Sequence, residues 1–259
     1  MQWLFPFFLR ADDLYLYHSA RSLALGKATV AQNAEWDSPS SLTTFENRLG
    51  CLIGYQNNYS MKQLSTYRLG VSYRFDWLES RVQLSRFGYE TYNETLLSLN
   101  LSKQLSEHWL IGIRLNGLVI QYPEGKRSSY LSPEVALSFF FIRWGIAAHV
   151  ANLRYTVWKR GESVNVLPAV YRIGFFGRPL PELLLTGELF KSSLAPFSGR
   201  AGIEYLPLKT FSLRLGFYTS PFVPSIGVGW KYRKFGIDTS FSWHSVLGIS
   251  SALQISFYL

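Results

Sequence analysis

The sequence ends on SALQISFYL, residues 251–259, and this stretch keeps a strand pattern up to its last residue. One face of it carries the apolar side chains of Leu253, Ile255, Phe257 and Leu259. Chain ends normally fray, because the last few residues bury too little surface to offset their conformational entropy. A strand that persists to the end of the chain therefore needs a partner strand.

The same alternation recurs upstream and predicts about fourteen strands and no helix after residue 48. The predicted strands cover residues 49–57, 64–75, 78–87, 91–104, 108–121, 130–141, 143–151, 165–177, 181–191, 197–206, 209–219, 223–233, 235–244 and 247–259.

The two faces of these strands differ consistently. In FSLRLGFY, residues 211–218, apolar and aromatic side chains share one face, and Ser212, Arg214 and Gly216 share the other. A soluble sandwich would bury the apolar faces between two sheets. A membrane barrel would turn them toward lipid and line its lumen with the polar faces. Alternation alone leaves both architectures open.

The lengths of the connections favour the barrel. Long and short connections alternate along the chain, as in up-and-down barrels whose successive turns lie at opposite rims. Trp77, Trp109 and Trp144 fall near junctions, as in the aromatic girdles of such barrels. The predicted fold class is therefore all-β: a transmembrane antiparallel up-and-down β-barrel of about fourteen strands, in the outer membrane of a Gram-negative bacterium, with both termini periplasmic.

Composition excludes several other classes. Aromatic residues make up 17% of the chain and charged residues only 17%, against roughly 25% charged residues in an average protein. The long apolar run at 137–150 is interrupted by Arg143, so no spanning helix is predicted. Basic residues give a formal charge of +9, but they are scattered and form no stripe, so nucleic acid is not an expected partner.

Motifs of catalysis and metal binding are missing from the sequence. Cys51 is the single cysteine, and the four histidines have no metal-ligand spacing. Asp238 and His244 share a strand face, but at about 3.3 Å per residue they lie about 20 Å apart. We therefore expect no enzyme, no cofactor and no metal site.

A barrel must close on itself, because lipid offers no hydrogen bonds to an open sheet edge. The last strand is therefore predicted to pair with LGCLIGYQN, residues 49–57. It also resembles the C-terminal signal read by the barrel-assembly machinery, although Leu259 stands where such signals commonly end on an aromatic residue. The expected partners thus include the lipid bilayer and, during biogenesis, that machinery.

Charges on the polar faces predict an ion-pair network in the lumen. A turn at Lys234–Phe235 would place Lys231 opposite Asp238, and a hairpin near Leu194 would place Arg200 opposite Glu188. The predicted network comprises Arg68, Arg74, Arg114, Arg172, Glu188, Arg200, Glu204, Arg214, Lys231 and Asp238. It either neutralises lumenal charge or forms a polar constriction.

The first 48 residues lack this alternation. Residues 1–11, MQWLFPFFLRA, are interpreted as the remnant of an export signal. Residues 12–48 are rich in small side chains, and a strand begins immediately after them. Residues 49–259 form the predicted barrel.

SARSLALGKATVA, residues 19–31, followed by WDSPSSL, residues 36–42, resembles the N-terminal signature of fatty-acid-transporter-like (FadL-like) outer-membrane barrels, in particular the PorV and PorQ branch of type IX secretion. The resemblance covers about the first hundred residues, and Ser38 stands where asparagine is usual. It implies a fourteen-stranded barrel with residues 12–48 folded inside as a plug.

In this interpretation the plug is anchored by Leu23, Leu25, Gly26, Val30, Trp36 and Pro39. DSPSSL would start a short helix capped by Asp37 or Ser38, with Pro39 at its first position.

The resemblance implies two alternative functions, neither of them enzymatic. The first is an accessory subunit of an envelope secretion or surface-assembly complex. Its protein partner would contact loop residues Tyr122, Tyr130, Tyr155 and Trp158. The alternative is a transporter of small hydrophobic molecules across the outer membrane. The short loops of this chain favour the accessory role.

Overall fold

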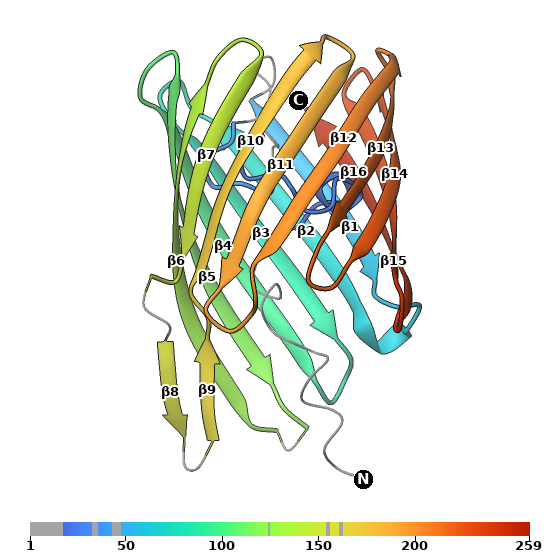
Figure 1. Cartoon of the computed structure of the whole chain (residues 1–259). Helices are drawn as coiled ribbons and strands as arrows, with labels where there is room; N and C mark the ends of the chain where they lie inside the picture. The colour runs from blue at the N-terminus through green and yellow to red at the C-terminus, as the bar shows by residue number, and fades with distance from the viewer. Residues whose placement is uncertain (1–17, 33–35, 43–47, 124, 154–155, 161–162) are drawn as a thin grey trace.

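The computed structural model describes residues 18–32, 36–42, 48–123, 125–153, 156–160 and 163–259. Within these residues, fourteen strands form a single closed antiparallel barrel, as predicted (Figure 1). The interpretation of residues 1–11 as an export-signal remnant lies outside the described residues.

The barrel strands are β1 (Leu49–Asn57), β2 (Ser65–Arg74), β3 (Glu79–Gly88), β4 (Asn93–Gln104), β5 (Trp109–Gln121), β6 (Arg127–Phe140), β7 (Trp144–Ala151), β10 (Val170–Leu180), β11 (Leu183–Ser192), β12 (Ser198–Leu208), β13 (Phe211–Tyr218), β14 (Val223–Tyr232), β15 (Phe235–His244) and β16 (Gly248–Tyr258). A short 3₁₀ turn, η1 (Lys62–Leu64), precedes β2.

Strands that follow one another in the chain are also neighbours in the barrel, with one interruption. β7 pairs with β10, because β8 (Thr156–Arg160) and β9 (Ser163–Leu167) form a separate hairpin. This hairpin extends beyond one rim of the barrel (Figure 1). The strand predicted at 165–177 therefore begins later, at Val170, and continues to Leu180.

The closing strand pairs as predicted. β16 is antiparallel to β1 from Asn57↔Ser251 to Gly50↔Tyr258. Beyond the strand, the Leu259 backbone N–H donates to the Leu49 carbonyl at 2.8 Å, and the Leu259 carbonyl accepts from Leu49 N–H at 3.0 Å. These bonds hold the end of the chain and leave no open edge between the first and last barrel strands.

Apolar side chains cover the outside of the barrel. Leu215 is 57% exposed and Ile226 is 54% exposed, whereas a sandwich would bury both. Trp77, Trp109 and Trp144 are exposed beside the short connections, consistent with a girdle at that rim. The outer surface is thus suited to lipid.

The two rims differ in their connections. One, the short-turn rim, carries the tight connections and the chain end at Leu259. It lies at the top of Figure 1. The other, the long-loop rim, carries the 152–169 segment with its hairpin. The remaining loops there are shorter than the sequence suggested, because strands such as β6, which begins at Arg127, extend into them.

Replacing Leu215 with arginine tests the orientation of the outer face. Leu215 lies near the middle of β13 and points outward. We expect a loss of about 2–4 kcal/mol in the free energy of unfolding, measured by urea titration in lipid vesicles, because the charge would sit near the bilayer midplane. Tyr232→Arg is the matched control, because Tyr232 lies at the short-turn rim. Its expected loss in the free energy of unfolding is about 0–1 kcal/mol. Equal losses for both variants would contradict a membrane-spanning outer face.

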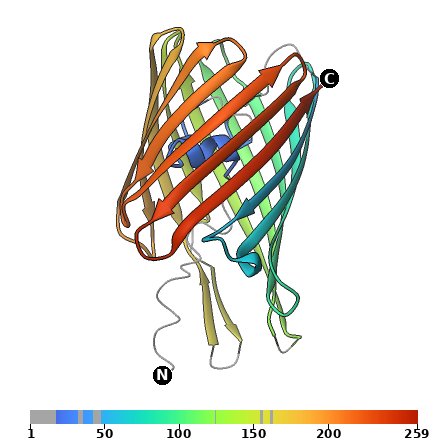
Figure 2. The same cartoon turned by 90° about the vertical axis from the view of Figure 1, so that its right-hand side faces the viewer.

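Residues 18–32 and 36–42, here called the inner segment, lie inside the barrel (Figure 2). The segment contains one short helix, α1 (Ala20–Ala24), which contacts β13, β14, β15 and β16. In the described part of the chain, no helix has the length and apolar character needed to cross a membrane.

Candidate functional site

The inner segment folds around a capped helix. The Ser19 hydroxyl accepts from Ser22 N–H at 3.1 Å and donates to Asp37 at 2.6 Å, so Asp37 ties both halves of the segment together. Burial raises the pKa of the Asp37 carboxyl above its ordinary value, although its hydrogen bonds from Ser19 act in the opposite direction.

The expectation of a short helix at DSPSSL was wrong. Residues 36–42 form turns, and the helix lies instead at Ala20–Ala24. The reason is that the capping groups act elsewhere: the Asp37 carboxylate binds Ser19, and the Pro39 carbonyl accepts from the wall residue Ser102 at 2.7 Å. Tertiary hydrogen bonds therefore override the local capping pattern.

Most of the predicted plug anchors are buried inside the barrel. Leu25, Val30 and Trp36 are at most 2% exposed. Gly26 has φ +63°, a conformation that glycine adopts readily. Leu23 lies at the edge of the segment and lines a cavity described below.

Wall glycines make room for this segment. A Cβ on Gly216 would stand 2.7 Å from Leu25 Cα, and one on Gly70 would stand 2.7 Å from the Trp36 ring. On Gly112 it would stand 2.5 Å from Ser40 N. The glycines on the inner faces of the strands thus permit close backbone approach.

Wall arginines and a glutamate supply hydrogen bonds to the irregular backbone of the inner segment. Arg81 Nη2 donates to the Ser41 carbonyl at 2.7 Å, and Arg114 Nη1 donates to the Asp37 carbonyl at 3.3 Å. Glu188 accepts from Thr29 and Val30 N–H at 3.1 and 3.0 Å. These charges satisfy backbone groups that have no helix or sheet partner.

The predicted charges form two groups around glutamates. Glu188 binds Arg172 at 2.7 Å and Arg200 at 3.2 Å, the latter in the register expected. Glu204 binds Arg214 at 2.7 Å, and Arg214 also binds Asp238. The inner segment joins the second group through Arg21, which binds Glu204.

Other predicted members lie apart from these groups. The Lys231–Asp238 pairing was wrong: the turn falls at Arg233–Lys234, so Lys231 faces Gly236 and Asp238 faces Gly229. Lys231 is exposed at the short-turn rim, with Nζ 5.7 Å from the Tyr258 ring centroid. Arg68 and Arg74 are only half-buried, Arg68 donating to Gln56 and Arg74 lying opposite Glu79.

A third group contains the predicted Arg114, but sequence reasoning missed its partners. Glu134 binds His149 at 3.0 Å and Arg114 at 3.6 Å, and all three side chains are at most 2% exposed. Arg81 and Glu79 are also fully buried, 3.4 Å apart. The alternation of polar and apolar residues in 79–88 and 127–140 could have indicated Glu79, Arg81 and Glu134, because these three residues lie on the polar face of their strands.

An apolar cluster also lies in the lumen, near the long-loop rim. It consists of the buried residues Leu96, Leu118, Tyr130, Ala151, Leu167, Val170 and Phe190. Leu96 pairs with Leu118, and Leu118 with Tyr130, across β4, β5 and β6. This lumenal apolar cluster is unusual on a strand face that is otherwise polar.

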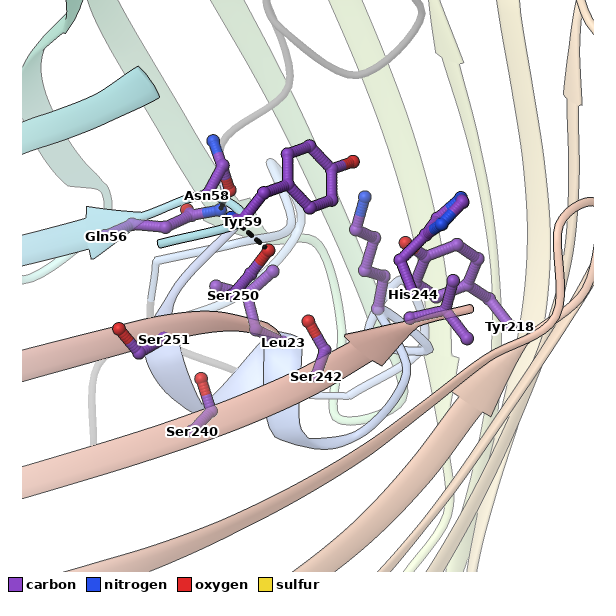
Figure 3. Close-up of a pocket in the computed structure, with 12 residues that line it drawn as sticks. Leu23, Gln56, Asn58, Tyr59, Tyr218, Ser240, Ser242, His244, Ser250 and Ser251 are labelled. Atoms are coloured by element: carbon purple, nitrogen blue, oxygen red, sulfur yellow. Dashed lines mark hydrogen bonds between the residues drawn. The ribbon is translucent and has the colours of Figure 1, made fainter. Parts of the chain in front are cut away.

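A cavity of about 70 Å³, here called the mouth pocket, lies on the opposite side of the lumen near the long-loop rim (Figure 3). Its walls come from β1, β13, β14, β15, β16 and the inner segment. The lining residues are Leu23, Lys27, Gln56, Asn58, Tyr59, Tyr218, Val223, Ser240, Ser242, His244, Ser250 and Ser251.

The residues expected to contact a protein partner are placed differently from one another. Tyr122 is half-buried just past β5, with its ring 6.1 Å from that of Tyr92. Tyr130 was expected on a loop but lies within β6, buried in the lumenal apolar cluster, because β6 begins earlier than predicted. Tyr155 lies outside the described residues, and Trp158 lies in β8, where side chains are not described.

Within the described ranges, no group of three or more histidine, cysteine, aspartate or glutamate side chains is placed to hold a metal ion.

A closed fourteen-strand barrel with an apolar exterior and a charged interior defines the class: a β-barrel of the outer-membrane type. No protein-family model and no curated protein matches the sequence.

Solved structures match this fold along almost the whole chain. The monoaromatic hydrocarbon channel CymD superposes with a TM-score of 0.67 at 11% identity, covering 93% of this chain and 97% of its own. The toluene transporter TodX of Pseudomonas putida gives 0.65 at 10% identity, covering 93% and 96%. Omp33 of Acinetobacter baumannii gives 0.55 at 9% identity, covering 82% and 98%. These similarities confirm the outer-membrane barrel fold, and they do not show the PorV and PorQ branch.

Proposed function

We propose that this protein is a non-enzymatic outer-membrane channel that admits small apolar molecules through its long-loop rim. The observation that carries the proposal is the lumenal apolar cluster near that rim, in which six buried residues of barrel strands pack with Leu167 at the end of β9. An apolar surface in the lumen offers a binding step for a molecule that water solvates poorly.

The comparisons with solved structures also support a channel for small apolar molecules. CymD and TodX, which share the fold over more than nine-tenths of this chain, are described as a monoaromatic hydrocarbon channel and a toluene transporter. We therefore place the substrate class among compact hydrocarbons. The transporter alternative replaces the secretion-accessory role, which finds no support in these similarities and has lost Tyr130 as an outward-facing contact.

In this proposal the short-turn rim faces the periplasm, together with the chain end at Leu259, and the long-loop rim faces outward. Short periplasmic turns and longer extracellular loops are the usual arrangement of outer-membrane barrels. The inner segment acts as a plug, because it lies in the lumen between the two rims (Figure 2).

Replacing Leu118 with asparagine tests the apolar binding step. Asparagine has nearly the shape of leucine but would place an amide against Leu96 and Tyr130. We expect the dissociation constant for toluene, measured by calorimetry on the folded barrel in detergent, to rise about tenfold.

Leu118→Met is the matched control, since it keeps the site apolar at similar volume and should bind within about threefold of the parent. If Asn and Met variants bind toluene equally, or the parent binds none, the proposed function is wrong.

A further inference from the structure

Exposed basic side chains gather at the short-turn rim, at the top of Figure 1. Those in its turns or at its strand ends that bind no carboxylate of the described chain are Lys103, Arg143, Arg178, Lys209, Lys231, Arg233 and Lys234. The exposed acidic side chains of this rim are Asp76, Glu107 and Glu182, and Asp76 already binds Arg48 at 3.2 Å. The rim therefore keeps a surplus of positive charge that the protein itself does not neutralise.

Two of these cations lie against aromatic rings on the outside of the barrel. Lys103 Nζ stands 5.6 Å from the centroid of the Trp77 ring, and Arg233 Cζ stands 5.3 Å from that of Tyr232. Lys103 follows the exposed Leu101 at the strand period of two, so its side chain leaves β4 on the lipid side. The two contacts lie on separate strands, so the same arrangement occurs twice around the rim.

Aromatic rings fix the depth of these cations in a bilayer. Tyr232 stacks on Trp230 with 5.8 Å between ring centroids. Across the next strand pair, Phe235 lies opposite Tyr232 and 4.7 Å from the Phe257 ring. Such rings mark the boundary between acyl chains and headgroups in outer-membrane barrels. A cation just beyond them reaches the level of the lipid phosphates while its stem covers apolar surface.

The densest part of this surface is the β14–β15 turn with its neighbour. Arg233 and Lys234 are consecutive in that turn, and Lys209 lies in the β12–β13 turn. The two turns are adjacent, because Lys231 N–H donates to the Thr210 carbonyl at 2.8 Å. Like charges this close repel one another, and an anion between them relieves the repulsion. Guanidinium and ammonium groups both donate strong, charge-assisted hydrogen bonds to phosphate oxygens.

From this arrangement we infer that the short-turn rim binds the phosphate headgroups of anionic phospholipids in the leaflet around it. The outer face takes the acyl chains, and Lys103, Arg233 and Lys234 take the headgroups. In the orientation proposed above, this leaflet is the periplasmic one. The inference rests on the membrane placement of the barrel and not on the passage of hydrocarbons, so it is tested separately from the proposed function.

Spin-labelled lipids test this surface on the full-length barrel in phosphatidylcholine vesicles. Electron paramagnetic resonance measures the fraction of each labelled lipid that the protein immobilises. At low salt we expect labelled phosphatidylglycerol to associate about twofold to threefold more strongly than labelled phosphatidylcholine, and the preference should shrink as salt rises. The double variant Arg233→Gln with Lys234→Gln should lose about half of that preference, and adding Lys103→Gln should lower it further.

The double variant Lys62→Gln with Lys126→Gln is the control, because it removes the same charge from two exposed lysines in connections of the long-loop rim. It should keep the preference of the parent. Equal association of both lipids with the parent would overturn the inference and leave a soluble acidic partner as the occupant of the rim. An equal loss in both double variants would also overturn it, because net charge and not this surface would then set the preference. Heat-modifiable gel migration shows that each variant is folded, and toluene binding by the same samples reports on the channel function.

Discussion

Glu188→Leu is expected to destabilise the protein by about 3–5 kcal/mol, the cost of leaving buried charges without their partner. Glu188 is the common acceptor of two buried arginines: Arg172 donates to it at 2.7 and 2.9 Å, and Arg200 at 3.2 Å. The same carboxylate accepts from Thr29 and Val30 N–H. Leucine would therefore remove the carboxylate partner of two buried guanidinium groups and one hydrogen bond from each of two backbone donors.

The measurement is equilibrium unfolding by urea in detergent micelles, followed by tryptophan fluorescence. Glu182→Gln is the matched control, since Glu182 is exposed in the short connection before β11 and should change stability by no more than about 0.5 kcal/mol. The double variant Glu188→Leu with Arg172→Met should recover part of the loss, because it removes one of the two buried charges that lose the Glu188 carboxylate. An unfolding midpoint for Glu188→Leu equal to that of Glu182→Gln would refute this account of the group.

The predicted ion pairs differ in how well strand register could be assigned from the sequence. The pairing of Glu188 with Arg200 follows from strand period and hairpin register, both of which are local. The Lys231–Asp238 pairing failed by a shift of the turn to Arg233–Lys234, because tight turns at KYRKF leave the register undetermined by two residues. Register predictions across tight turns are thus only as good as the assignment of the turn.

The fold itself was predictable because its signal repeats. Fourteen strands that all turn one apolar face outward into lipid require a closed sheet, because an open edge would have no hydrogen-bond partners there. β16 pairs with β1 accordingly. The inner segment is a different case. Its conformation depends on contacts from strands far along the chain, such as Arg81 to Ser41 and Glu188 to Val30. No local pattern in residues 18–42 encodes those partners, so the helix was expected in the wrong half.

Glycines on the inner face were visible in the sequence, but their purpose was not. A glycine facing a lumen could face water, or it could face another backbone. The distinction comes from the packed structure, where the position of a Cβ on Gly202 would fall 2.7 Å from the Leu25 carbonyl oxygen. The barrel wall and the inner segment therefore constrain one another, and substitution of these glycines separates their roles.

Gly216→Val is expected to displace the inner segment while leaving the barrel folded. The added Cβ would fall inside contact distance of the Gly26 nitrogen and 2.7 Å from Leu25 Cα, and both of these are backbone atoms that cannot rotate away. β13 is held by hydrogen-bonded neighbours on both sides, β12 and β14, and valine suits a strand. The inner segment has no such ladder, so it is the partner that moves.

A fourteen-strand barrel is too wide for wall side chains alone to fill, so a displaced inner segment should leave an open aqueous path. We therefore expect Gly216→Val to raise single-channel conductance in planar bilayers several-fold. Gly177→Val is the matched control, because a Cβ at Gly177, on β10, meets no atom within 4 Å. Gly216→Ala adds the Cβ alone and should give a smaller rise. If Gly216→Val keeps its heat-modifiable migration yet conducts no better than Gly177→Val, the inner segment does not obstruct the lumen, and its proposed role as a plug fails.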